Sequence, residues 1–94
     1  MNEAQDYRPD PEVIVTELDT GEAVLLHLGT RMYYSLNETG LRIWALLSDG
    51  LTTTEIAERL TSTYEVTSEN AERSVVATIE HLRQEKLVLD RSVE

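Results

Sequence analysis

The sequence predicts an α+β domain that is winged helix-turn-helix-like, with a three-stranded antiparallel sheet followed by three helices. Three short runs rich in apolar and β-branched residues come first, at residues 12–18, 22–28 and 31–36. Three segments with apolar residues at helical spacing follow, each preceded by a capping signal. The strands therefore precede the helices, whereas in a winged helix they come last. A chain of 94 residues suffices for one such domain.

Turn residues between the three extended runs predict a meander. Residues 12–18 end at Asp19-Thr20-Gly21, and Gly29-Thr30 separates the second and third runs at the spacing of a tight hairpin. Alternation along the third run gives it two faces, one with Met32, Tyr34 and Leu36 and the other with Arg31, Tyr33 and Ser35. Three strands are stable only if one face of the sheet is covered, so we expect the helices to cover it.

Capping residues mark the start of each helix. Asn37 suits the first helix, Thr52-Thr53-Thr54-Glu55 is a capping box for the second, and Thr67 or Ser68 caps the third. The apolar stripe of the third helix consists of Ala71, Val75, Ile79 and Leu82. After it, Leu87-Val88-Leu89 predicts either a short final strand or a packed tail.

The two ends of the chain are predicted to be tails around one domain at residues 12–90. Residues 1–11 are polar and contain Pro9 and Pro11, which predicts a flexible segment, and residues 91–94 form a short C-terminal tail. The beginning has no signal-peptide pattern, and no run approaches the ~20 apolar residues that span a bilayer. Together with the absence of cysteine, this favours a cytoplasmic protein.

Residue types that carry catalysis or bind metal are scarce. His27 and His81 are the only histidines, and no metal-binding motif lies near either of them. The sequence also contains no nucleophile-elbow or phosphate-loop motif. Structural or surface roles therefore explain both histidines. The sequence predicts no enzyme, no catalytic residue, no cofactor and no metal site.

The charge of the chain argues against nucleic acid and anionic membranes as partners. The formal net charge is −10, which repels phosphates and favours basic partners. Arg73, Arg83 and Lys86 on the third helix are outnumbered there by glutamates. A winged-helix DNA-binding regulator stays an alternative, and it predicts measurable binding to duplex DNA at low salt.

The third strand is the strongest candidate for a binding surface. In a meander it is an edge strand, and only Arg31 protects it by charge, whereas Met32, Tyr33 and Tyr34 are large. A flanking third helix would supply the second wall of a groove that captures an extended peptide by strand addition. Two alternatives stay open, namely that both tyrosines pack on the sheet and that the edge pairs with a second copy of the chain.

The run Tyr33-Tyr34-Ser35-Leu36-Asn37-Glu38-Thr39-Gly40, followed by Ile43-Trp44 and Leu47, resembles the PqqD-like family. Thr54-Glu55-Ile56-Ala57 and the stripe of the third helix continue the resemblance, which covers roughly residues 13 to 89. The resemblance implies a RiPP recognition element, a domain that binds the leader of a ribosomally made and modified peptide. It also implies that the leader pairs with the third strand and lies against the third helix.

Mapped onto this chain, the resemblance implies a peptide-binding site on two elements. The site residues would be Arg31, Met32, Tyr33, Tyr34, Ser35 and Leu36 on the strand, with Val75, Val76, Ile79 and Arg83 on the third helix. Val75 and Ile79 also belong to the apolar stripe, so they could be core instead. Which of Tyr33 and Tyr34 faces the peptide stays open.

A member of this size without a fused enzyme looks most like the leader-binding protein of split lasso-peptide pathways. The resemblance then implies a non-catalytic adaptor whose partners are the precursor leader and a leader peptidase of the cysteine-protease type, with an ATP-dependent macrocyclase as a further partner. The alternative in the same family is a peptide chaperone for the radical enzyme of PQQ biosynthesis. The oligomeric state and the peptide product stay open.

Overall fold

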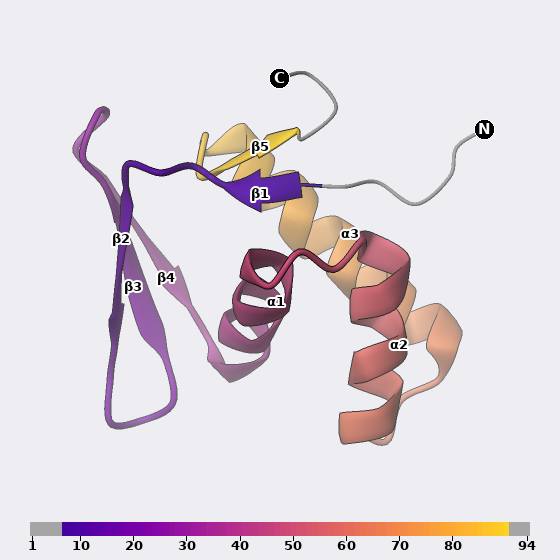
Figure 1. Cartoon of the computed structure of the whole chain (residues 1–94). Coiled ribbons are helices and arrows are strands. Elements are labelled where there is room, and N and C mark those ends of the chain that lie inside the picture. The colour runs from indigo at the N-terminus through magenta and orange to yellow at the C-terminus, as the bar shows by residue number, and fades with distance from the viewer. Residues whose placement is uncertain (1–6, 91–94) are drawn as a thin grey trace.

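The computed structural model describes residues 7–90, in which a sheet precedes three helices (Figure 1). The strands and helices are β1 Tyr7–Pro9, β2 Val13–Glu17, β3 Ala23–His27, β4 Met32–Leu36, α1 Glu38–Ser48, α2 Thr53–Thr63, α3 Ser68–Gln84 and β5 Val88–Asp90. The predicted α+β fold is confirmed, and the final segment forms a strand rather than a packed tail.

The main sheet is an antiparallel meander in the order β2-β3-β4. Its register places Leu25 of β3 between Val15 of β2 and Tyr34 of β4. Leu25 is completely buried, so this row points to the core and the neighbouring row points away from it. β4 is an edge of the sheet, as the meander predicts.

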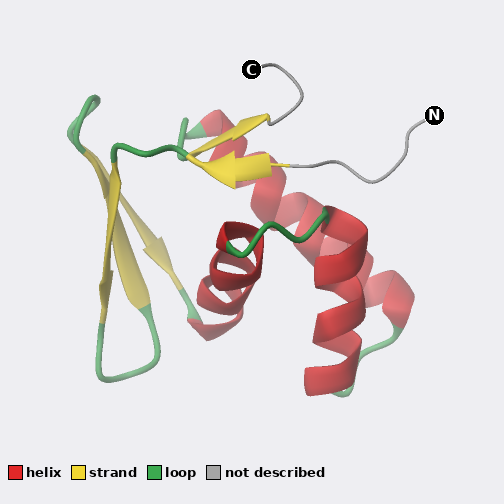
Figure 2. Ribbon diagram, viewed as in Figure 1, coloured by secondary structure: helices red, strands yellow, loops and turns green. Residues whose placement is uncertain are grey.

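Each helix begins at a predicted cap. The Asn37 side chain accepts a hydrogen bond from the Gly40 backbone N–H at 2.7 Å, and Thr52 and Glu55 form the expected capping box. Thr67, rather than Ser68, caps α3. Only Asn37 separates β4 from α1, so the end of β4 is fixed to the start of that helix (Figure 2).

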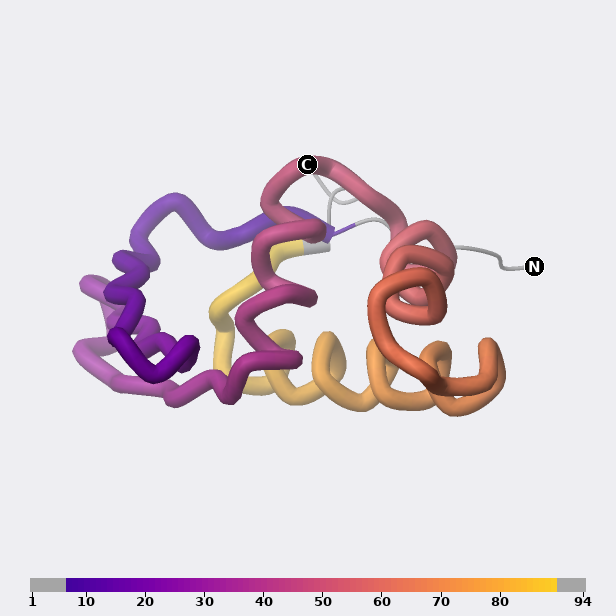
Figure 3. The backbone as a smooth tube through the Cα atoms, turned by 90° about the horizontal axis from the view of Figure 1, so that it is seen from below, coloured from indigo at the N-terminus to yellow at the C-terminus, as the bar shows by residue number. Residues whose placement is uncertain are grey.

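The helices lie on one side of the sheet. In Figures 1 and 3, α1 lies between the sheet and α2, and α3 runs along one side of the helical layer. A single core joins the two layers. Its buried residues include Ala23, Leu25 and Leu36 from the sheet, Ile43, Trp44 and Leu47 from α1, Ile56 and Leu60 from α2, and Ala71, Val75, Ile79 and Leu82 from α3.

The prediction of a flexible tail over residues 1–11 is wrong for residues 7–9. These residues form β1, which pairs with β5 in a separate antiparallel ribbon, and Tyr7 is buried. Pro9 is tolerated there because each strand of a two-stranded ribbon has a free edge, where a missing N–H leaves no ladder bond unmade. Residues 1–6 and 91–94 lie outside the described residues.

The connection between β3 and β4 is longer than the predicted two-residue hairpin. The strands pair up to His27 and Met32, so residues 28–31 form the turn. Arg31 takes the left-handed conformation with a φ of 65°, and its N–H donates to the His27 carbonyl at 2.7 Å. Arg31 therefore precedes β4 instead of beginning it.

Candidate functional site

The free edge of β4 is the feature from which the site is built. β4 pairs with β3 along one edge, and within residues 7–90 no strand pairs with its other edge. Backbone N–H and C=O groups of alternate residues on such an edge are available to an added strand. Proline is absent from β4 and so is any charged residue, so neither device that usually blocks an edge is present.

Tyr33 and Tyr34 lie on opposite faces of the sheet. Tyr34 is paired with the buried Leu25 and is itself half-buried, on the side of the helices. Tyr33 is paired with Leu26 on the other face and is 71% exposed. Tyr34 is therefore the tyrosine that faces α3.

Tyr34 contacts α3 directly through His81. Its hydroxyl lies 2.8 Å from Nδ1 of His81, and the two rings meet edge to face with centroids 4.9 Å apart. Burial raises the pKa of Tyr34, and the nearby Glu85 carboxylate raises it further. A tyrosine hydroxyl is protonated at neutral pH even at its ordinary pKa of 10.0, so the Tyr34 hydroxyl can donate or accept a hydrogen bond here. This contact joins β4 to the C-terminal half of α3.

His81 shows which face of α3 is turned toward β4. At about 100° per residue, Ser74 lies about 20° from His81 around the helix, Ala77 about 40° and Thr78 about 60°. By the same geometry, Val76 lies about 140° from His81 and Arg83 about 160°. The face of α3 that meets Tyr34 therefore carries Ser74, Ala77, Thr78 and His81, none of which was predicted as a site residue.

Val76 and Arg83 are exposed elsewhere on α3. Val76 is 52% exposed, and it lines an open hollow of about 510 Å³ on this helix together with Glu69, Glu72, Arg73, Ala77 and Glu80. The Arg83 guanidinium pairs with the Glu80 carboxylate at 2.7 Å. The structure thus does not bring either predicted residue beside Tyr34.

Three other predicted site residues belong to the core. Val75, Ile79 and Leu36 are 0%, 3% and 4% exposed, so all three side chains are packed in the core of this structure. Met32 is 59% exposed and lies on the same face of β4 as Tyr34. Arg31 and Ser35 are exposed as well. Of the ten predicted residues, Met32 and Tyr34 present exposed or half-buried side chains on the helix side of β4.

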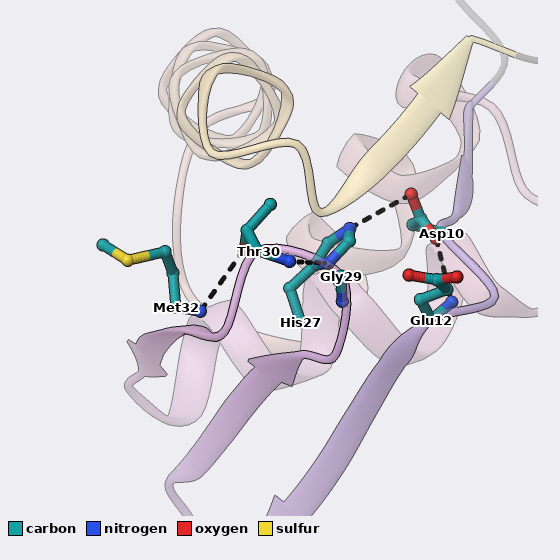
Figure 4. A network of polar contacts seen from close by, with 6 residues as sticks. All are labelled: Asp10, Glu12, His27, Gly29, Thr30 and Met32. Carbon is teal, nitrogen blue, oxygen red and sulfur yellow. Dashed lines mark hydrogen bonds and ion pairs between the residues drawn. The ribbon is translucent and has the colours of Figure 1, made fainter.

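A polar network fixes the turn that leads into β4 (Figure 4). Nδ1 of the buried His27 accepts hydrogen bonds from the backbone N–H groups of Gly29 at 3.0 Å and Thr30 at 3.2 Å. Because Nδ1 accepts both, the ring proton is on Nε2, which donates to the Asp10 carboxylate at 3.3 Å. The predicted structural role of His27 thus consists of holding the start of β4 against the segment before β2.

Metal-binding clusters and membrane-spanning helices were both sought among residues 7–90. Within residues 7–90, no group of three or more His, Asp or Glu side chains is placed to hold a metal ion. None of the helices in the same range is both long and apolar enough to cross a bilayer.

A family model described as coenzyme PQQ synthesis protein D (PqqD) matches residues 22–88. The chain belongs to the PqqD family. The match extends from just before β3 to the first residue of β5, so it includes the β4 edge and α3. No curated protein matches the chain.

Two solved structures are similar to this PqqD family member over most of its length. One is described as TbiB1 in complex with the TbiA(beta) leader peptide, with 32% sequence identity, a TM-score of 0.81, and coverage of 86% of this chain and 93% of that one. The other is a lasso peptide synthetase B1 complexed with the leader peptide, with 36% identity, a TM-score of 0.81, and coverage of 89% and 98%. These likenesses confirm the predicted PqqD-like recognition element and its fold.

Proposed function

We propose that the chain is a non-catalytic, cytoplasmic adaptor that binds the leader of a ribosomally made precursor peptide. The leader adds as a strand to the free edge of β4, with its alternate side chains directed toward α3. The loaded adaptor then delivers the precursor to a leader peptidase of the cysteine-protease type. An ATP-dependent macrocyclase acts on the same precursor afterwards.

The observation that carries this proposal is an open edge beside a helix. β4 has an edge with no paired strand, and the Tyr34–His81 contact places α3 next to it. A leader in this position gains backbone hydrogen bonds from β4 and side-chain contacts from α3. Two similar proteins are described in complex with leader peptides, which supports the same ligand class here.

Two observations bear on the pathway in which the adaptor works. The family model is described by coenzyme PQQ synthesis, whereas both solved relatives are leader complexes, and one is described as a lasso peptide synthetase B1. That relative is 36% identical over 89% of this chain. This similarity over nearly the whole of both chains favours the lasso-peptide pathway over the role of a PQQ chaperone.

Titration of the full chain with the fluorescently labelled leader of its own precursor tests the proposal. Fluorescence polarisation should give saturable binding, and a quinone-cofactor precursor peptide should bind at least about tenfold more weakly. No saturable binding of either peptide at high micromolar concentration would reject the adaptor function. Tighter binding of the quinone-cofactor precursor would instead support the PQQ chaperone.

Backbone N-methylation of the leader tests strand addition separately. In a β-ladder, only alternate residues direct their N–H toward a given neighbour. Methyl groups placed one at a time should therefore weaken binding about tenfold or more at every second position and little between them. An effect without this period of two would exclude strand pairing while leaving leader binding intact.

A further inference from the structure

His27 is a buried titratable side chain that lies outside the leader groove. It is 6% exposed and is the last residue of β3, where it is paired with Met32 at the start of β4. A polar side chain in such a place costs free energy unless its hydrogen bonds are made. The bonds that the His27 ring makes therefore indicate what the residue does.

Three hydrogen bonds connect the His27 ring to the first residue of β4 (Figure 4). Nδ1 accepts the backbone N–H groups of Gly29 and Thr30, and the Thr30 hydroxyl accepts the Met32 N–H at 3.3 Å. Met32 begins the strand to which the proposed function adds the leader. The ring thus determines the position of this end of the leader-binding strand.

The turn depends on these bonds because it contains an unfavourable backbone conformation. Arg31 has a φ of 65°, in the left-handed region that residues other than glycine rarely adopt. Such a conformation persists only where its surroundings hold it. Here the His27 carbonyl holds the Arg31 N–H, and the His27 ring holds the two residues before it. Loss of the ring's bonds should therefore let the turn relax and move Met32.

Asp10 fixes which ring nitrogen carries the proton. One carboxylate oxygen accepts from Nε2 of His27 at 3.3 Å, and the other accepts the Glu12 N–H at 2.8 Å. The Asp10 N–H donates to the Leu87 carbonyl at 2.9 Å, so the carboxylate has a fixed position. The Glu12 carboxylate lies at the same turn, since a methyl group at Gly29 would come within 2.5 Å of its Oε1. Two carboxylates therefore lie around the ring.

A second proton on the ring removes the acceptor on which the turn depends. Nδ1 then becomes a donor that points at two backbone N–H donors. The Asp10 carboxylate stabilises the charged ring through Nε2, but it offers no acceptor to Gly29 or Thr30. The protonated ring therefore cannot hold the turn, whatever its contact with Asp10 contributes.

We propose that neutral His27 is a positioning residue of the leader site, and that a proton on its Nδ1 weakens leader binding. The inference rests on the proposed function. His27 acts through Thr30 and Met32 rather than by contact with the leader. By linkage, a bound leader favours the neutral ring, because binding requires the turn that this ring holds.

His27→Asn separates the acceptor from the proton. An asparagine carbonyl oxygen accepts the N–H two residues ahead, so it should keep the bond to Gly29, and it does not titrate. His27→Ala removes the acceptor altogether. His81→Asn is the matched control, because it makes the same substitution at the only other histidine of the chain and leaves His27 in place.

Fluorescence polarisation with the full chain and the labelled leader of its own precursor gives the Kd at about pH 7.5 and about pH 5.5, a range in which histidines change charge. The Kd of the unmodified chain and of His81→Asn should rise about tenfold or more at the lower pH. His27→Asn should bind within about threefold of the unmodified chain at the higher pH and change less than about twofold. His27→Ala should bind about tenfold more weakly at both. Asp10, Glu12 and the leader's own groups are common to the unmodified chain and His27→Asn, so their titration cancels.

NMR of the chain without leader supplies a second measurement. The amide chemical shifts of Gly29 and Thr30 should move between the two pH values in the unmodified chain and in His81→Asn. They should stay nearly constant in His27→Asn. Circular dichroism at both pH values establishes that each variant is folded. If His27→Ala does not fold, the comparison of His27→Asn with the unmodified chain still decides the matter.

The outcomes separate this inference from the proposed function. Absence of leader binding by the unmodified chain at the higher pH would overturn the proposed function and, with it, the inference. Leader binding whose Kd is the same at both pH values, or rises equally in His27→Asn, would overturn only the inference. Amide shifts of Gly29 and Thr30 that do not move in the unmodified chain would overturn it as well.

Discussion

The two faces of the three-stranded sheet are built from residues that alternate along the same strands, yet they differ in burial and in what they contact. Leu25 is completely buried, and the next residue, Leu26, lies half-exposed on the outer face, which points away from the helices. Tyr34 reaches α3 through His81, whereas Tyr33 is among the most exposed apolar side chains. The period of two thus lets one strand contribute to the core, to the proposed leader groove and to an exposed apolar surface at once.

Truncation of Leu25 and Leu26 should give the largest difference between the two faces. Leu25→Ala removes buried methyl groups and leaves a cavity, so we expect a loss of about 2–5 kcal/mol of unfolding free energy. Leu26→Ala removes half-exposed atoms and should cost about 1 kcal/mol. Urea denaturation followed by circular dichroism measures both changes. Equal losses would contradict the assignment of the two faces.

Replacement of the two tyrosines should separate leader binding by face. Tyr34→Ala removes the aromatic side chain toward α3 and should weaken leader binding by about tenfold or more. In the proposed strand addition, Tyr33 would meet only the outward leader residues, so Tyr33→Ala should weaken binding by about threefold. Fluorescence polarisation gives both Kd values, after circular dichroism has established that each variant is folded. The reverse order would assign the leader groove to the outer face.

The titration of Tyr34 should make the inner face sensitive to alkaline pH. Burial and Glu85 raise the pKa of Tyr34 in the folded chain above its ordinary value of 10.0. The unfolded chain therefore loses this proton first, so the stabilising contribution is present below pH 10 and falls as the pH rises through the folded pKa.

Tyr34→Phe removes this contribution. Unfolding free energies measured from about pH 9 to about pH 11 should decrease less steeply for the variant than for the unmodified chain. The other titrating groups are common to both proteins and cancel in the comparison. Identical slopes would show that Tyr34 is not held in a protonated state by folding.

The smallest expected effect is that of salt on leader association, which depends on the net charge of the chain rather than on either face of the sheet. With a net charge of −10, the chain should attract a basic leader segment, and added salt should lower the association rate by about tenfold or less. Stopped-flow fluorescence at increasing salt measures this rate. An association rate independent of salt would exclude the electrostatic contribution and leave the groove unaffected.

Local patterns predict most of this fold. The alternation in β4 and the caps at Asn37, Thr52 and Thr67 depend on residues close together in the sequence, so the strands and helices begin near the expected positions. The pairing of β1 with β5 joins opposite ends of the chain, and no local pattern encodes it. The only signal available in the sequence was Tyr7 itself, since a large aromatic residue is unusual in a flexible tail.

The candidate site is harder to predict than the fold, and its two walls differ in this respect. The β4 wall can be predicted from the order of the strands and the alternation of side chains. These two features place Met32 and Tyr34 on the helix side of β4. The α3 wall depends on how the helix is rotated relative to β4, and the apolar stripe reveals only the side that faces the core. His81 is polar and lies outside that stripe, so its contact with Tyr34 becomes visible only in three dimensions.

The ribbon of β1 and β5 has a consequence for how the domain can be connected to other chains. Tyr7 and Asp90 are direct partners in its register, so the two ends of the described fold lie about 5 Å apart. A host protein could receive the whole domain within a single surface loop, and a short linker could close the domain into a circle. Both connections would begin at the β1-β5 ribbon, which is separate from the β2-β3-β4 sheet, so an inserted or circular form of the domain should still bind the leader.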